Sequence, residues 1–194
     1  MLTDPIQVML LVVESMEKLG IPYLIGGSLA SSIHGIARAT RDADIIADIQ
    51  EKHAEVLADG LKDRFYVDSE VIKEAIRHRS FFNFIHLDSM FKIDVYILKQ
   101  DAFSKEEFKR RKRIVVNLSP EKTAYVATPE DTILSKLEWF RMGGEISDRQ
   151  WNDVLGILKV QRGRLDMDYL QRWARELNLA DLFKRSLEEA EIDV

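Results

Sequence analysis

The sequence predicts an α/β (α+β) protein, with a mixed β-sheet flanked by helices and followed by a helical C-terminal portion. Two observations support this fold class. Helix and strand signals alternate through the first two thirds of the chain, and from residue 128 onward the hydrophobic pattern is wholly helical. The 194 residues suffice to bury one sizeable core. The expected division is 1–127 for the α/β core and 128–194 for a C-terminal helical region.

The first elements alternate between helix and strand. Apolar residues at Met9, Val13 and Met16 have helical spacing and predict an amphipathic first helix that packs inward. The apolar run before Gly26 predicts a short buried strand, and Ser28 marks the start of the next helix. The following elements are expected as a strand over 43–49, a helix over 51–62, a strand over 65–67 and a helix over 69–78.

The segment 81–98 predicts a β-hairpin, because two β-rich runs are joined by the turn Leu87-Asp88-Ser89. In its second run, side chains alternate between two faces, so Asp94 points away from the face of Ile93 and Val95. Two further short strands are expected in "RIVVNL" and "TAYVAT". The basic run "KRRKR" at 109–113 is expected in a solvated loop rather than in a binding site; if the chain acts on RNA, this run would be the first place to look for backbone contacts.

Strong capping signals introduce the C-terminal helices. Thr128 is followed by proline and two acidic residues, which are typical of a helix start, and a glycine pair at 143–144 ends that helix. Ser147 and Gln150 form a second capping box ahead of the next helix. Two more helices are expected over 166–176 and 179–190.

The composition excludes several classes of protein. A formal net charge of −5 argues against an indiscriminate nucleic-acid coat protein. The absence of cysteine excludes a disulfide framework and a thiolate metal site, and it fits a reducing compartment, so a cytoplasmic location is expected. The apolar N-terminal segment is too short and too acidic for a membrane span and lacks the features of a signal peptide. No membrane partner is therefore expected.

Asp42 and Asp44 are the first candidate site residues. Residues two apart on a strand project from the same face, so both carboxylates point into the same small volume. Two like charges held together favour a cation between them, and hard oxygen ligands suit Mg²⁺. The alternative is that Asp42 caps the start of the strand and Asp44 simply faces water.

Two further features give this pair a chemical context. Gly26, Gly27 and Ser28 form a strand-to-helix turn, where unpaired backbone N–H groups and the helix dipole favour a phosphate; such a turn is also common without any ligand. Asp94 lies within an apolar strand, where a carboxylate is costly to bury without a partner. Its alternative is a solvent-facing position on a half-exposed strand.

Together these features resemble the nucleotidyltransferase superfamily that shares the DNA polymerase β-like core. The fuller pattern "GGSLASSIHG…R.T.DAD" resembles the branch of AbiEii/AbiGii-type toxins and their uncharacterised relatives. Later motifs of that branch are matched by Lys136 in "EDTILSKLEW" and Asp153 in "DRQWNDVLGIL". The sequence departs from the branch at Gln150, where an acid is common, which leaves the role of this second helical motif open.

The resemblance implies a nucleotidyltransferase core over 1–127 and a metal-dependent activity. Asp42, Asp44 and Asp94 would bind two Mg²⁺ ions, and Asp94 would also draw the proton from the acceptor hydroxyl. The nucleotide triphosphate would be held by a set of glycine, serine and basic residues: Gly26, Gly27, Ser28, Arg41 and Lys136. Support is expected from Arg38 and Asp153.

The resemblance further implies the toxin of a two-gene system, which would move a nucleoside monophosphate from an NTP to RNA, with tRNA ends as one acceptor. A cognate antitoxin protein would then be a partner. A protein or a small molecule such as an antibiotic is an alternative acceptor. A second hypothesis is a catalytically silent relative that serves as a binding or antitoxin-like module, against which the three intact acids argue.

Overall fold

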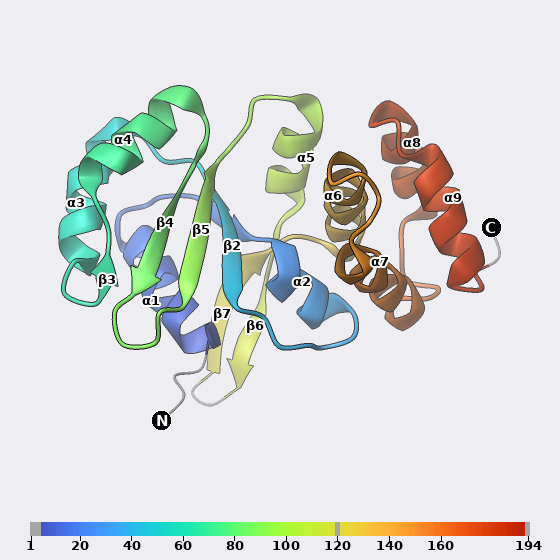
Figure 1. Cartoon of the computed structure of the whole chain (residues 1–194), viewed down its shortest axis with the longest axis horizontal. Coiled ribbons are helices and arrows are strands. Elements are labelled where there is room, and N and C mark those ends of the chain that lie inside the picture. The colour runs from blue at the N-terminus through green and yellow to red at the C-terminus, as the bar shows by residue number, and fades with distance from the viewer. Residues whose placement is uncertain (1–4, 119–120, 193–194) are drawn as a thin grey trace. The chain divides into compact units, whose positions relative to one another are not determined.

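A computed structural model describes residues 5–118 and 121–192 (Figure 1) and confirms the predicted α/β class. The chain divides into two compact units, one of Met1–Gly26 with Thr40–Val126 and the other of Gly27–Ala39 with Ala127–Val194. The division predicted from the sequence, at residues 127 and 128, stays a prediction; the second unit includes a segment from the first half of the chain.

Within the described residues, all strands belong to the first unit and form one seven-stranded sheet of order β3-β4-β5-β2-β1-β7-β6. β2 runs parallel to β5 and β1 runs parallel to β7, whereas the remaining neighbours are antiparallel. The strands are β1 (Tyr23–Ile25), β2 (Asp42–Ala47), β3 (Phe65–Tyr66), β4 (Phe81–His86), β5 (Lys92–Ile97), β6 (Lys112–Leu118) and β7 (Glu121–Val126).

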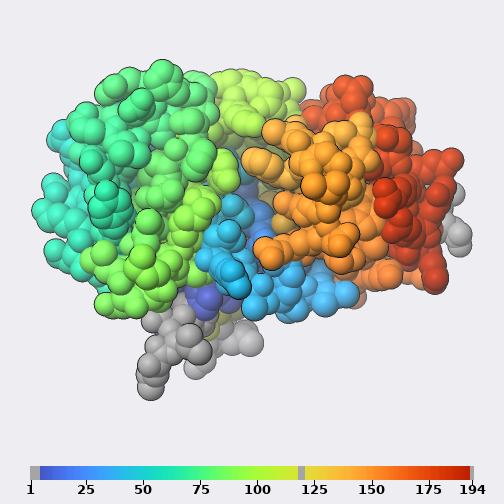
Figure 2. Space-filling view, viewed as in Figure 1, coloured from blue at the N-terminus to red at the C-terminus, as the bar shows by residue number. Residues whose placement is uncertain are grey.

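Helices of the first unit pack against this sheet. α1 contacts both β2 and α3, and α3 packs beside α4. The inward-facing residues of the central strands, such as Ile45, Ile93 and Val95, are fully buried, as alternation along a strand requires. The helices of this unit are α1 (Pro5–Lys18), α3 (Glu51–Leu61), α4 (Ser69–His78) and α5 (Ala102–Arg110). Figure 2 shows atoms of α3, α4 and the β4–β5 hairpin at the surface of the unit.

Helix α5 corrects the expectation of a solvated loop over the basic run. Asp101 caps the helix, because its carboxylate accepts a hydrogen bond from the backbone N–H of Ser104 at 2.8 Å. Lys109 and Arg110 form its last turn, where positive charge suits the negative end of the helix dipole. The capping signal at Asp101 is present in the sequence, but the charged composition of the segment obscured it.

The second unit is helical, as the pattern after residue 128 predicted. Its helices are α2 (Gly27–His34), α6 (Pro129–Met142), α7 (Asp148–Val160), α8 (Met167–Glu176) and α9 (Ala180–Glu189). Thr128 and Ser147 cap α6 and α7 by accepting backbone hydrogen bonds from Asp131 and Gln150, so both predicted helix starts are confirmed. Over the described residues, no helix is long and apolar enough to cross a bilayer.

Helix α2 packs tightly against α6 and α7 although it is remote from them in sequence. Where α2 ends, Gly35 approaches the backbone of α7 so closely that a Cβ there would lie 2.8 Å from the nitrogen of Ile157. The side-chain amide of Gln161 donates to the carbonyl of His34 at 2.7 Å, and a ring nitrogen of His34 lies 2.7 Å from the carbonyl oxygen of Ala127. The segment 27–39 is thus built into the helical unit by both packing and hydrogen bonds.

Substitution of Gly35 by alanine is expected to destabilise the protein by about 2 kcal/mol, because backbone atoms of α7 must move to admit the new methyl group. Urea unfolding followed by circular dichroism measures this change. Gly60→Ala is the matched control. A Cβ at Gly60 meets nothing within 4 Å, and alanine in a helix gains about 0.5–1 kcal/mol over glycine. Equal stability of the two variants would contradict the tight approach of α2 to α7.

Candidate functional site

The three candidate acids lie on one face of the sheet in the first unit. β2 and β5 pair in parallel, and Asp44 is directly opposite Asp94 while Asp42 is opposite Lys92. Because side chains alternate, Asp42, Asp44 and Asp94 share the face opposite to the buried Ile45 and Val95. Register and alternation thus bring together the three acids that the sequence predicted to converge; their chemical role stays a prediction.

Asp94 is the most buried of these acids, with 6% of its surface exposed. One of its oxygens, Oδ2, lies 2.7 Å from the Nζ of Lys92. The other, Oδ1, is buried and has no hydrogen-bond partner among the described residues. A buried carboxylate oxygen without a partner loses its hydration without compensation, so Oδ1 is the type of atom that a ligand normally satisfies.

Lys92 introduces a cation that the sequence analysis did not single out. Its hydrogen bond to Asp94 raises the pKa of the Lys92 ammonium, and the charges of Asp94, Asp42 and Asp44 add to this effect. Burial and the nearby charges of Asp44, Asp94 and Asp42 likewise raise the pKa of the Tyr96 hydroxyl to about 12. The charges of the three carboxylates thus contribute to both pKa shifts, after burial for Tyr96 and after the hydrogen bond to Asp94 for Lys92.

Backbone and side-chain contacts fix the two β2 acids. The hydroxyl of Thr40 donates to Oδ1 of Asp42 at 3.1 Å and lies 2.9 Å from its carbonyl oxygen. The backbone N–H of Gly26, just after β1, donates to the carbonyl of Asp44 at 3.0 Å. The end of β1 is therefore tied directly to the acid pair, and the position of Thr40, two residues before Asp42, is a signal that the sequence contains.

These residues fit a divalent cation by chemistry. All the donors are hard carboxylate oxygens, which Mg²⁺ prefers, and Asp94 offers a buried oxygen without a partner. In the described part of the chain, however, no three His, Cys, Asp or Glu side chains lie closely enough to hold a metal ion as they stand. The ammonium of Lys92 contacts Asp94 in this arrangement instead.

The glycine turn links the end of β1 to the start of α2. Gly27 has φ +54°, in the left-handed region where glycine is favoured, and it allows the chain to pass from strand to helix within one residue. The helix begins at Gly27, one residue before the predicted start at Ser28. Free backbone N–H groups at such a helix start are suited to an anion.

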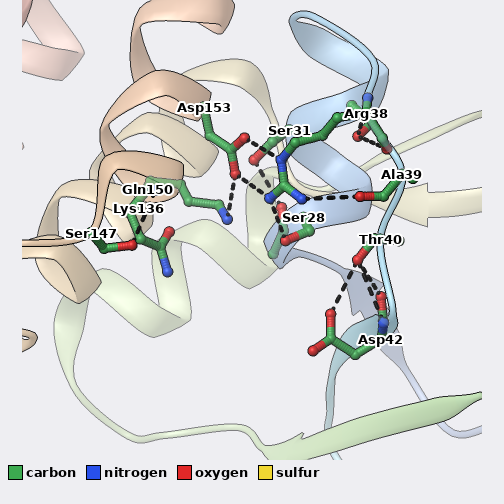
Figure 3. Close-up of polar contacts among 12 residues, drawn as sticks. Ser28, Ser31, Arg38, Ala39, Thr40, Asp42, Lys136, Ser147, Gln150 and Asp153 are labelled. Carbon is green, nitrogen blue, oxygen red and sulfur yellow. Dashed lines mark hydrogen bonds and ion pairs between the residues drawn. The ribbon is translucent and has the colours of Figure 1, made fainter.

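Ser28, Arg38, Lys136 and Asp153 form a charged network inside the second unit (Figure 3). Asp153 receives a two-pronged contact from Arg38, with Nε–Oδ1 and Nη2–Oδ2 distances of 2.7 and 2.8 Å. The Nζ of Lys136 lies 2.9 Å from Oδ2 of the same carboxylate. Arg38 also donates from Nη2 to the hydroxyl of Ser28 at 2.9 Å. A hydroxyl that accepts this bond keeps its own proton available for a ligand.

This network carries a net positive charge with little access to water. Lys136 and Asp153 are buried, and the side chain of Arg38 is 26% exposed. Burial alone would raise the pKa of Asp153, but the hydrogen bond from Arg38 and the charge of Lys136 lower it below its ordinary value. Asp153 is therefore ionised at neutral pH and offsets one of the two cations, which leaves an excess positive charge beside Ser28.

The remaining predicted residues differ in their environment. Arg41 is exposed, in contrast to the partly buried Arg38. Gln150 stands where the related branch commonly has an acid, and its side-chain Oε1 is buried with no hydrogen-bond partner among the described residues. Gln150 is thus a further polar group with unused hydrogen-bonding capacity in the unit of Lys136 and Asp153.

The basic run 109–113 has structural contacts. The guanidinium of Arg111 stacks on Phe108 and on Tyr125, at 4.3 and 5.1 Å from the ring centroids. Arg113 also lies over Tyr125 and donates from Nε to the hydroxyl of Thr123 at 2.9 Å. These two arginines join α5 and β6 to β7, so the run is not simply a solvated loop.

No family model matches the sequence, and no curated protein matches it. Solved structures do match. An antigenic nucleotidyltransferase-like protein from Paracoccidioides brasiliensis has a TM-score of 0.56 and 13% identity, over 99% of this chain and 95% of its own. The lincomycin-bound lincosamide antibiotic adenylyltransferase LnuA has a TM-score of 0.51 and 13% identity, over 81% and 97%. The antibiotic-resistance factor ANT(2'')-Ia has a TM-score of 0.54 and 10% identity, over 98% and 97%.

At these identities the likeness shows the fold. The chain has a mixed α/β fold consistent with that of the nucleotidyltransferases, as the resemblance in its motifs implied. None of the three neighbours is described as an AbiEii-type toxin, so that narrower branch stays a prediction.

Substitution of Asp153 by asparagine is expected to lower the free energy of unfolding at pH 7 by about 3–5 kcal/mol, because Arg38 and Lys136 lose their shared counter-charge in a buried setting. The lowered pKa of Asp153 means that its contribution is complete above the unfolded value of about 3.9 and is lost as pH falls through the folded value. The difference between variant and wild type should therefore shrink in acid.

Chemical denaturation at several pH values measures this effect. Asp181→Asn is the matched control, because Asp181 also pairs with an arginine, Arg141, but on an exposed surface; no measurable change is expected there. An Asp153→Asn variant as stable as the wild type would show that the two cations do not depend on this carboxylate.

Proposed function

We propose that this chain is a nucleotidyltransferase that moves a nucleoside monophosphate from an NTP to an acceptor hydroxyl and releases pyrophosphate. One observation carries the proposal: Oδ1 of Asp94 is buried without a hydrogen-bond partner in the described part of the chain, on the strand face that also bears Asp42 and Asp44. A solvent-facing aspartate on a half-exposed strand needs no such burial. Strand register holds three acids on one face, and one oxygen of Asp94 there has no hydrogen-bond partner among the described residues. Such an arrangement is more typical of a catalytic site than of charged residues on a surface.

In this proposal, Asp42, Asp44 and Asp94 bind the Mg²⁺ ions. Bound Mg²⁺ would supply charge stabilisation for the attacking and leaving oxygens. Asp94 accepts the proton of the acceptor hydroxyl, whose oxygen forms a bond to the α-phosphorus as the bond to pyrophosphate breaks. Thr40 holds the carboxylate of Asp42, and the β1 contact at Gly26 holds the backbone of Asp44.

The triphosphate contacts are assigned to the turn and to the charged network. Gly26 and Gly27 allow the backbone to approach the phosphates, and Ser28 donates its free hydroxyl proton. Lys136 supplies a point charge, and Asp153 keeps it in place together with Arg38. Arg41 remains a candidate for contact with the phosphates because it is exposed and immediately precedes Asp42.

The acceptor is a finer part of the proposal. The motif resemblance favours the toxin of a two-gene system acting on RNA, such as tRNA ends, with an antitoxin protein as partner. In the basic run, Arg111 and Arg113 contact Tyr125, and the side chain of Arg113 stays half exposed. Two structures of similar fold belong to antibiotic-modifying or antibiotic-resistance proteins, one of them bound to lincomycin. This supports a small-molecule hydroxyl as the second acceptor class.

A catalytically silent binding or antitoxin-like module is the alternative. Such a module has no physical need for a buried acid with an unsatisfied oxygen, which lowers stability unless a ligand binds it. The same experiment distinguishes the two functions.

The decisive test is incubation with each α-labelled NTP and Mg²⁺, together with total RNA, protein extract or a panel of hydroxylated antibiotics. Label is expected in one fraction, which identifies the acceptor class. Asp44→Asn should reduce transfer by a factor of about 100 or more, because it removes a carboxylate from the ion-binding face. Asp59→Asn, an exposed acid of α3 paired with Lys62, is the matched control and should retain activity.

Thermal unfolding provides an independent readout. An NTP with Mg²⁺ should raise the unfolding temperature of the wild type and of Asp59→Asn, whereas Asp44→Asn should lose this stabilisation. Binding without transfer to any fraction would favour the silent module. The absence of both binding and transfer would contradict the proposed function.

A further inference from the structure

Lys92 is placed differently from an ordinary surface lysine. It lies at the start of β5, directly across from Asp42 and two residues before Asp94, on the face that carries all three acids. Its Nζ is 2.7 Å from Oδ2 of Asp94, and its side chain is only 42% exposed. A partly exposed lysine therefore places its ammonium beside an almost fully buried carboxylate.

The two oxygens of Asp94 consequently have different environments. Oδ2 is in contact with the ammonium of Lys92, whereas Oδ1 has no hydrogen-bond partner among the described residues. The side chain of Asp94 is 9% exposed, so neither oxygen is freely hydrated. Lys92 thus leaves a single oxygen of Asp94 for any incoming group.

The charge of Lys92 also acts on the other two acids. Asp42 and Asp44 both contribute to the electrostatic stabilisation of its ammonium, although neither is its direct partner. Three carboxylates and one ammonium still leave a net negative charge, which attracts a cation but less strongly than three carboxylates alone. Lys92 therefore acts as an internal counter-ion for the whole acidic face.

We propose that Lys92 is a positioning residue that holds Asp94 by one oxygen and competes with free divalent cations for the acidic face. It keeps the three acids together before any ion arrives, and it weakens the binding of ions that come without nucleotide. This inference rests on the proposed function, because it takes Asp42, Asp44 and Asp94 as the ion ligands.

The test is a titration of the full chain with Mn²⁺ in the absence of nucleotide, with free Mn²⁺ measured by its electron paramagnetic resonance signal. Lys92→Met keeps the length of the side chain and removes the charge, so it should bind Mn²⁺ about tenfold more tightly than the wild type. Lys92→Arg keeps the charge and should stay near the wild-type affinity. If Lys92 acted through packing alone, Lys92→Met and Lys92→Arg would not differ in Mn²⁺ affinity in this way.

Lys73→Met is the matched control, because Lys73 lies on helix α4 and contacts two acids, Glu55 of α3 and Glu70 of α4, that are not part of the acidic face. It should leave Mn²⁺ affinity unchanged. Circular dichroism melts establish that each variant is folded, and if Lys92→Met does not fold, Lys92→Gln gives the same comparison with Lys92→Arg.

The outcomes distinguish this inference from the proposed function. If Asp44→Asn abolishes Mn²⁺ binding but the neutral Lys92 variants bind no more tightly than wild type, the counter-ion role is wrong and the ion site stands. If neither the wild type nor the neutral Lys92 variants bind Mn²⁺, or if Asp44→Asn binds it as well as the wild type, the ion site itself is wrong and both proposals fail. Tighter binding by the neutral variants alone supports the inference.

Discussion

The parallel pairing of β2 with β5 is the constraint on which the acidic face depends. These strands are far apart in sequence, and their register alone decides whether Asp44 meets Asp94 or a neighbouring residue. A shift by one residue would turn Asp94 into the apolar layer and bring Ile93 or Val95 to the acids. The fully buried residues on the opposite face resist such a shift, so the hydrophobic core fixes the geometry of the polar site.

The second unit contains a charged cluster in which cations outnumber the acids. Two cations are held in a poorly hydrated place, and a single buried carboxylate, Asp153, keeps them there. Complete neutralisation would leave no attraction for an anion, whereas removal of the counter-charge would strongly destabilise the unit. The compromise is a partly compensated cluster, with Ser28 at its edge. The acidic face of the first unit is compensated in the same partial way by Lys92.

Much of this fold follows from patterns that are local in the sequence. Alternation predicted β5 and the face of Asp94, and capping residues predicted the starts of α6 and α7, because these signals involve neighbours a few residues apart. Helix α5 was missed because its charged composition outweighed the cap at Asp101. The position of Lys92 opposite Asp42 depends on strand register, and the contacts of Asp153 with Arg38 and Lys136 depend on helix packing, so neither is encoded by nearby residues. The ion pair of Lys92 with Asp94 is local, because residues two apart on a strand share a face.

The assignment of α2 to the helical unit has a consequence for how this protein can be divided. The segment 27–39 lies early in the chain, yet its packing partners are α6 and α7. A fragment that stops near residue 127 would carry Leu29 and Ala30, which are buried in the full chain, without the helices that shield them. Such a piece would expose apolar surface and tend to aggregate. To produce the helical unit by itself, both of its segments would have to be expressed together, or joined in one chain by circular permutation.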